Sequence, residues 1–119
     1  MRIAVVGIGG VGGYFGGLLA RYYGGREETG VVFIARGEHL RKIQEKGLEL
    51  ITRKVTFSAV PERATDRPKG CGIFDLVLFC VKSYDLDEAA HMIRGNVTKE
   101  TVLISLLNGV DNAERLGAL

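Results

Sequence analysis

The chain has few of the residues that build metal sites and disulfides. Its 119 residues include two cysteines, Cys71 and Cys80, and two histidines. It has no CxxC pair and no cluster of cysteine and histidine at metal-ligand spacing, so we expect no metal site. Cys80 lies inside an apolar run and is interpreted as a small buried core residue, whereas Cys71 lies between glycines in a predicted loop. This use of cysteine fits a reducing, cytoplasmic location.

Several catalytic motifs are absent as well. The sequence contains neither G-x-x-x-x-G-K-[ST] nor G-x-S-x-G, which excludes a P-loop and the nucleophile elbow of the α/β-hydrolases. His39 and His91 have no cysteine or carboxylate constellation around them and are interpreted as surface histidines. Ser83 and Ser105 have no base partner in the sequence pattern. None of these histidines and serines is therefore expected to be catalytic.

Strong charge of one sign is also missing, since 16 Lys and Arg stand against 14 Asp and Glu. The basic excess lies within residues 36–69, where Phe57 is the only aromatic residue, so the pattern of a nucleic-acid site is absent. Residues 3–20 carry no charge, but seven of them are glycine, which leaves too little apolar side chain for a membrane span or signal peptide. We expect neither a nucleic-acid nor a membrane partner.

Glycine, by contrast, is abundant, with 17 residues. The first of them form a G-x-G-x-x-G motif, which reads Gly7-Ile8-Gly9-Gly10-Val11-Gly12. The motif follows an apolar run and precedes a helical pattern, which is the context of a dinucleotide-binding turn. Gly7 allows the tight turn, Gly9 lets a diphosphate approach the backbone, and Gly12 lets the helix pack closely on the strand. Because the free N–H groups of the helix would face the phosphates, the motif residues are predicted to bind the cofactor.

Alternating strands and helices are predicted along the whole chain. We expect strands over residues 1–6, 31–35, 74–81 and 101–107, and helices over 10–23, 38–46 and 85–93 and from 111 onward. Leu40 and Ile43 should face inward, Gly47 should end its helix, and Asp85 should cap the next helix with Glu88 as its capping-box partner. Residues 48–51 and 55–57 form either two short strands around a polar turn or one interrupted strand. Residues 61–72 are predicted to be a loop.

This pattern predicts an α/β fold, a doubly wound parallel sheet of the Rossmann type with helices on both faces. Residues 1–119 are expected to form a single nucleotide-binding domain. The chain stops a few residues into its last predicted helix, whereas such a sheet normally continues to a further strand. We therefore expect an incomplete domain, truncated on its C-terminal side.

Polar residues follow the strands where a ligand of an open parallel sheet would lie. Arg36 stands after the second strand, where an NAD-preferring site has Asp or Glu, so it is predicted to bind a 2′-phosphate and to select NADP(H). Lys82 is either an exposed strand terminator or a cation near the nicotinamide and substrate. Asn108 is either a turn residue before Gly109 or a group that orients a carboxamide or a substrate oxygen.

Four blocks of the sequence resemble the ketopantoate reductases (2-dehydropantoate 2-reductases). They are Gly7-Ile8-Gly9-Gly10-Val11-Gly12-Gly13-Tyr14-Phe15-Gly16-Gly17, Ala35-Arg36-Gly37-Glu38-His39-Leu40, Asp75-Leu76-Val77 leading into Val81-Lys82-Ser83-Tyr84, and Leu107-Asn108-Gly109-Val110-Asp111. They occur in the family's order and extend across the chain, so the resemblance is specific.

The resemblance implies NADPH-dependent reduction of 2-dehydropantoate to pantoate, in pantothenate and coenzyme A biosynthesis. It also implies that Lys82 and Asn108 lie near the nicotinamide and the substrate. The family's catalytic lysine and glutamate belong to a C-terminal helical domain with no counterpart here, so this chain alone should be inactive. Two alternatives are a reductase of another 2-oxo acid and a non-catalytic nucleotide-sensing module. The expected partner is a small 2-oxo acid, and a homodimer is compatible with the sequence.

Overall fold

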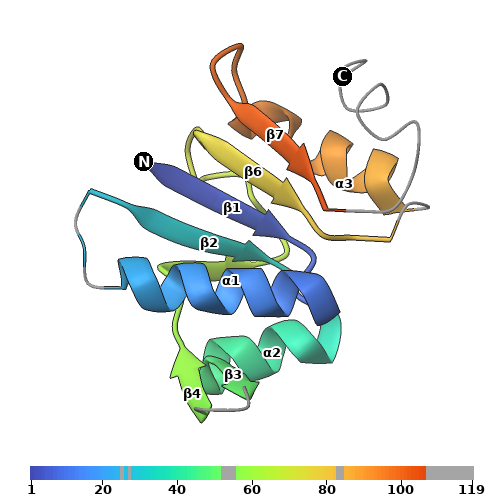
Figure 1. Cartoon of the computed structure of the whole chain (residues 1–119). Helices are drawn as coiled ribbons and strands as arrows, with labels where there is room; N and C mark the ends of the chain where they lie inside the picture. The colour runs from blue at the N-terminus through green and yellow to red at the C-terminus, as the bar shows by residue number, and fades with distance from the viewer. Residues whose placement is uncertain (25, 27, 52–55, 83–84, 107–119) are drawn as a thin grey trace.

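The computed structural model describes residues 1–24, 26, 28–51, 56–82 and 85–106. Its main element is a five-stranded sheet in the order β5-β2-β1-β6-β7. The strands are β1 (Arg2–Val6), β2 (Gly30–Ile34), β5 (Arg63–Thr65), β6 (Leu76–Phe79) and β7 (Val102–Ser105), and every neighbouring pair is parallel. The chain winds outward from β1 in one direction and then restarts at β6 in the other (Figure 1). The predicted doubly wound α/β fold is therefore confirmed.

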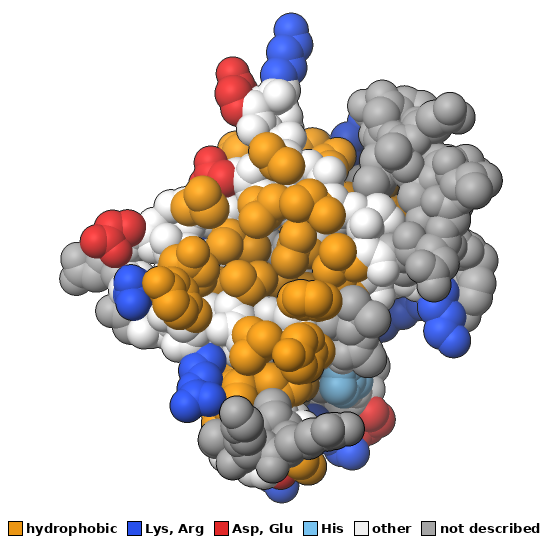
Figure 2. Space-filling view, viewed as in Figure 1, with side chains coloured by type: hydrophobic (Ala, Val, Ile, Leu, Met, Phe, Trp, Pro, Cys, Tyr) orange, Lys and Arg blue, Asp and Glu red, His pale blue; other side chains and the backbone are white. Residues whose placement is uncertain are grey.

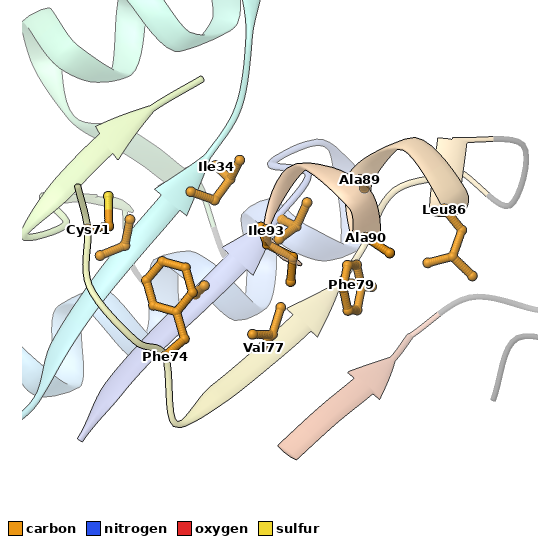
Figure 3. Packing of buried hydrophobic residues seen from close by; sticks show 12 residues of the cluster. Ile34, Cys71, Phe74, Val77, Phe79, Leu86, Ala89, Ala90 and Ile93 are labelled. Atoms are coloured by element: carbon orange, nitrogen blue, oxygen red, sulfur yellow. The ribbon is translucent and has the colours of Figure 1, made fainter. Parts of the chain in front are cut away.

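Each face of the sheet has its own hydrophobic core. On one face, α1 (Gly10–Tyr23) and α2 (Gly37–Lys46) contribute Ala20 and Ile43 to a cluster with Val5 and Phe33 of the sheet. The other core lies beneath α3 (Leu86–Met92) and the short 3-10 helix η2 (Arg94–Asn96). Figure 3 shows the apolar side chains of α3 directed toward those of β6. Successive side chains of a strand point to opposite faces of the sheet, so strands that are apolar throughout contribute to both cores.

A separate two-stranded sheet lies beside α1. It consists of β3 (Leu48–Ile51) and β4 (Thr56–Ala59), which pair antiparallel. Leu48 and Ala59 are buried in the core that α1 and α2 share. The structure thus selects the first of the two sequence-based alternatives, two short strands, while the predicted turn itself falls on residues 52–55, outside the described part. The α2 prediction is confirmed in detail: Leu40 and Ile43 are buried, and Gly47 ends the helix with a φ of +78°.

Two expectations about residues 61–81 need correction. The predicted loop 61–72 contains β5, a three-residue strand that pairs with β2. It was missed because a short edge strand that contains a charged residue and has a single partner has almost no hydrophobic pattern. The predicted strand 74–81 is shorter, although Asp75 and Cys80 still donate backbone hydrogen bonds to β1, at 2.8 Å each.

The connection from β5 to β6 contains no α-helix and is held by one buried polar side chain. Asn96 is 5% exposed, and its side-chain amide donates to the carbonyl oxygens of Pro68 at 2.9 Å and Gly72 at 2.8 Å. Its own carbonyl oxygen accepts a 2.7 Å hydrogen bond from the N–H of Phe74. These bonds tie the connection to the end of η2, so that Cys71 is buried and not exposed in an open loop.

β7 is more exposed than the sequence predicted. Its register pairs Val102 with Leu76 and Ile104 with Leu78, which places these side chains on the face that carries α1. Val102 is 55% exposed and Ile104 is 40% exposed, because the described helices of that face cover β1 and β2 instead. Figure 2 shows apolar side chains gathered in the middle of this face. Within the described residues, the expected buried strand is therefore an edge strand with one uncovered side.

The start of α1 approaches the sheet more closely than a side chain would allow. A Cβ atom on Gly12 would lie 1.8 Å from the carbonyl oxygen of Gly7 and 2.9 Å from Cβ of Cys80. Gly7 itself has a φ of +92°, a conformation that favours glycine. The structure thus confirms the predicted roles of Gly7 in the turn and of Gly12 in close packing. The side chain of Cys80 is half-buried at this contact, and desolvation raises the pKa of its thiol to about 11.

This contact predicts opposite effects for two neighbouring substitutions. Gly12→Ala should lower the free energy of unfolding by about 1–3 kcal/mol, because the new methyl group must push α1 away from the turn. Gly13→Ala is the matched control, since a Cβ there would lie no closer than 3.8 Å to another atom. It should be neutral or stabilise the helix by about 0.5–1 kcal/mol. Equal stability of the two variants in denaturant unfolding would contradict this account of Gly12.

Candidate functional site

The candidate site lies at the edge of the sheet where the parallel strands end. In Figure 1 the arrowheads of β1, β2, β6 and β7 point toward this edge. β1 runs into the glycine turn, β2 is followed by Ala35 and Arg36, and β6 is followed by Cys80, Val81 and Lys82. The strand order reverses beside β1, so the connections leave this edge in opposite directions, which is the arrangement at which open α/β sheets bind ligands. The topology therefore brings the predicted residues within the described part to one edge.

The glycine turn presents the beginning of α1 to this edge. The N–H of Gly7 donates a 2.9 Å hydrogen bond to Ile34, which fixes the turn against β2. Gly9 is the N-cap residue of α1 and has no side chain that could cap it, and the first turn contains no acidic residue. A Cβ atom on Gly9 would meet no atom within 4 Å. Gly10 and Val11 follow as the first helical residues, so the N–H groups of this turn have no partner within the helix.

This arrangement fits an anionic group above Gly9. The N–H groups that have no partner within the helix and the positive end of the helix dipole are directed to the same place, and no carboxylate of the first turn opposes them. The space above Gly9 is open, so a diphosphate meets backbone and not a side chain. The turn therefore has the geometry that the diphosphate of a dinucleotide requires.

His39 is a participant that the sequence did not indicate. Its Nε2 donates a hydrogen bond to the carbonyl oxygen of Ile8, which joins the first turn of α2 to the glycine turn. The side chain of Ile8 is only 3% exposed and anchors the same turn in the core. The prediction that His39 is a surface histidine is confirmed, since the residue is exposed, but its hydrogen-bond partner is a backbone atom distant in the sequence. No periodicity or spacing could have indicated this contact.

Arg36 extends from the end of β2 toward α3. It is the N-cap residue of α2, and its side chain is 72% exposed. Its guanidinium lies 4.0 Å from a carboxylate oxygen of Asp85 and 3.7 Å from one of Glu88, both at the start of α3. These ion pairs span the strand edge between the two halves of the sheet, where a bound adenosine would lie in a fold of this type.

The capping box predicted for α3 is not formed. Asp85 does occupy the N-cap position, but its backbone is helical, with φ −97° and ψ −4°, and its side chain makes no capping hydrogen bond. Capping requires an extended backbone that turns the carboxylate back toward the helix. Asp85 instead has its carboxylate at ion-pair distance from Arg36, a partner that the local sequence could not reveal.

Lys82 is exposed on the segment that packs against the glycine turn. The N–H of Cys80 donates a 2.8 Å hydrogen bond to Val6, and a Cβ atom on Gly7 would lie 2.8 Å from Cγ1 of Val81. Lys82 therefore follows directly on residues that contact the motif. Asn108 lies outside the described residues, so its predicted place beside Lys82 stays a prediction.

Two negative findings apply to the part of the chain that the structure describes. It contains no group of three or more His, Cys, Asp and Glu residues that could hold a metal ion. It also contains no helix with the length and apolar character needed to cross a lipid bilayer.

Comparison with known proteins connects this geometry with an enzyme family. The family model of ketopantoate reductase PanE/ApbA matches residues 3–119. A 2-dehydropantoate 2-reductase of Halobacterium salinarum is 39% identical over 118 residues, or 95% of this chain and 36% of that protein. The crystal structure of 2-dehydropantoate 2-reductase from Porphyromonas gingivalis W83 is 42% identical with a TM-score of 0.89, and the match covers 98% of this chain and 41% of that one.

A more distant structural neighbour is a ternary structure of D-mandelate dehydrogenase with NADH and anilino(oxo)acetate. It is 25% identical with a TM-score of 0.83, and the match covers 99% of this chain and 37% of that one. The chain thus spans between 36% and 41% of the length of these three proteins. Because the family model matches from the first strand to the last residue, the chain belongs to the ketopantoate reductase PanE/ApbA family.

Proposed function

We propose that the complete protein reduces 2-dehydropantoate to pantoate with NADPH, in pantothenate and coenzyme A biosynthesis, and that this chain supplies the cofactor-binding part. Family membership supports an oxidoreductase that uses a nicotinamide dinucleotide, and several relatives are named 2-dehydropantoate 2-reductase. The observation that carries the proposal is the common edge at which the open glycine turn and Arg36 stand. Residues 1–119 are accordingly proposed to be an NADP-binding domain of the Rossmann type.

The residues at this edge suit the two phosphate groups of NADPH differently. The start of α1 above Gly9 suits the diphosphate, which NADH and NADPH share. Arg36 suits the 2′-phosphate, which NADPH alone carries, because a guanidinium is a charged and often bidentate donor. The neighbouring D-mandelate dehydrogenase structure contains NADH. The fold therefore accommodates either cofactor, and we base the proposed choice of NADPH on Arg36.

The chemistry that a bound nicotinamide would supply is hydride transfer to the 2-oxo carbon. The residues of this chain contribute binding and charge. Lys82 is proposed to attract a cofactor phosphate or the substrate carboxylate, and Asn108 to orient a carboxamide or a substrate oxygen. No acid or base is assigned here, because the family resemblance places proton transfer on residues of a C-terminal helical domain.

A reductase of another 2-oxo acid is the second candidate. The specific observation in its favour is the neighbouring structure of D-mandelate dehydrogenase with anilino(oxo)acetate. A nucleotide-sensing module without catalysis is not favoured, since the relatives are named as reductases or oxidoreductases. A small 2-oxo acid is the proposed partner in either enzyme, while a homodimer and a cytoplasmic location stay expectations.

An activity assay of the complete protein tests the proposal. Purified protein is mixed with NADPH and either 2-dehydropantoate or a set of other 2-oxo acids, and oxidation of the nicotinamide is followed by absorbance. We expect the highest kcat/KM with 2-dehydropantoate and NADPH. A higher kcat/KM with another 2-oxo acid would support the second candidate, and no oxidation with any of them would contradict both.

The role of Arg36 predicts a selective loss of affinity. Arg36→Ala should weaken NADPH binding to the complete protein by about 1.5–3 kcal/mol, the range of hydrogen bonds to charged groups, and should leave NADH binding nearly unchanged. Titration calorimetry with both cofactors measures this difference. Arg94→Ala, an exposed arginine beyond the far end of α3, is the control and should change neither affinity. Equal NADPH and NADH affinities in the unsubstituted protein would contradict the assignment.

Substitution of Lys82 is expected to change ligand binding without changing the stability of the fold. Because its side chain is exposed, Lys82→Ala should leave the Tm within about 2 °C of the unsubstituted protein, as surface substitutions usually do. It should raise the KM for the 2-oxo acid or the Kd of the cofactor by about tenfold, since it removes one charged hydrogen bond. Steady-state kinetics and thermal unfolding together check this. A large drop in Tm would instead assign Lys82 a structural role.

A further inference from the structure

Arg36 lies beside two carboxylates. Its guanidinium lies 4.0 Å from Asp85 and 3.7 Å from Glu88. Glu38, the acidic residue nearest to it in sequence, is engaged elsewhere, in a 3.1 Å ion pair with Arg41. The anionic partners of Arg36 in the described residues are therefore contributed by α3 and not by its own helix.

We propose that Asp85 and Glu88 determine how strongly this protein discriminates NADPH from NADH, by competing with the 2′-phosphate for the guanidinium of Arg36. The inference rests on the proposed binding of the 2′-phosphate by Arg36 and adds two specificity-determining residues to it. A phosphate that reaches Arg36 must take the place of these carboxylates or share the guanidinium with them.

The packing of α3 fixes the backbone that carries the two acidic residues. Leu86 is fully buried, and Ala89, Ala90 and Ile93 are at most 5% exposed, so one side of the helix is fixed in the core (Figure 3). The N–H of Asp85 also donates a 2.8 Å hydrogen bond to the carbonyl oxygen of Lys82. The start of α3, which carries both acidic residues, is thereby tied to the end of β6.

The distances and exposures indicate whether the two carboxylates raise or lower the preference for NADPH over NADH. The side chains of Arg36 and Glu88 are 72% and 74% exposed, and both ion pairs are near the upper limit of contact distance. Ion pairs of this kind restrict an arginine side chain only weakly. The carboxylates therefore raise NADPH affinity very little by holding Arg36 in a position to bind the phosphate. Two negative charges beside an incoming phosphate repel it, whereas a carboxylate can accept a hydrogen bond from a 2′-hydroxyl. Both effects lower the preference for NADPH.

Neutral isosteric substitutions test the competition. In the complete protein, Glu88→Gln and Asp85→Asn should each increase the ratio of NADH Kd to NADPH Kd about twofold to fivefold, the range that exposed ion pairs allow. The increase should shrink at high salt, because screening weakens charge interactions at an exposed site. Glu100→Gln removes a carboxylate from the turn before β7, where Glu100 accepts a hydrogen bond from Thr98, and should leave the ratio unchanged.

The Arg36→Ala background separates this inference from the proposed function. If the carboxylates act by competing for Arg36, Glu88→Gln should lose most of its effect on the ratio once Arg36 is absent. An effect that persists in full in the Arg36→Ala background would overturn the competition, because direct repulsion of the phosphate by Glu88 does not need Arg36. A normal loss of NADPH affinity in Arg36→Ala, combined with an unchanged or lowered ratio in Glu88→Gln, would overturn the competition alone. If Arg36→Ala does not change NADPH affinity, both the competition and the assignment of Arg36 are wrong. Glu88 is exposed, so its substitution should not disturb folding, which thermal unfolding verifies.

Discussion

The backbone contact between Gly7 and Gly12 is the constraint on which the site depends. Because the position of a Cβ on Gly12 lies 1.8 Å from the carbonyl oxygen of Gly7, any larger residue would displace α1 from the end of β1. That displacement would move the first-turn N–H groups away from the space above Gly9. The same contact brings Cys80, and with it the segment that carries Lys82, against the turn. One close approach thus positions the proposed diphosphate site and the segment of Lys82 together.

The N-terminal turns of α1, α2 and α3 differ in the acidic residues that they bring to this edge of the sheet. The first turn of α1 has no acidic residue, and the first turn of α2 has Glu38, which pairs with Arg41. The start of α3 carries the carboxylates of Asp85 and Glu88, which face Arg36. The positive end of α1 is therefore open to an anion, whereas the neighbourhood of Arg36 is partly neutralised. A common diphosphate and a variable 2′-substituent would consequently meet different electrostatic environments within one site.

The sequence predicted best what local rules determine. The bounds of α1 were predicted as found, because a glycine motif opens the helix and paired glycines follow it. The inward residues of α2 followed from its 3.6-residue period. Tertiary context decided the rest. β5 forms through its pairing with the edge of β2. β7 is exposed on one side because the described helices of that face cover β1 and β2. The contacts of His39 and Asp85 join distant segments, and no local pattern contains that information.

Family membership and cofactor choice depend on different parts of this structure. The glycine turn, the sheet order and the packing of α1 are features that a dinucleotide requires whether its ribose carries a phosphate or a hydroxyl. A neighbour with NADH therefore matches this chain with a TM-score of 0.83 without bearing on its selectivity. Selectivity has to come from the few side chains that reach the ribose, and we propose Arg36 and the two carboxylates beside it for this role. A change at Glu88 alters no packed contact of the core, so cofactor preference can shift while the fold stays the same.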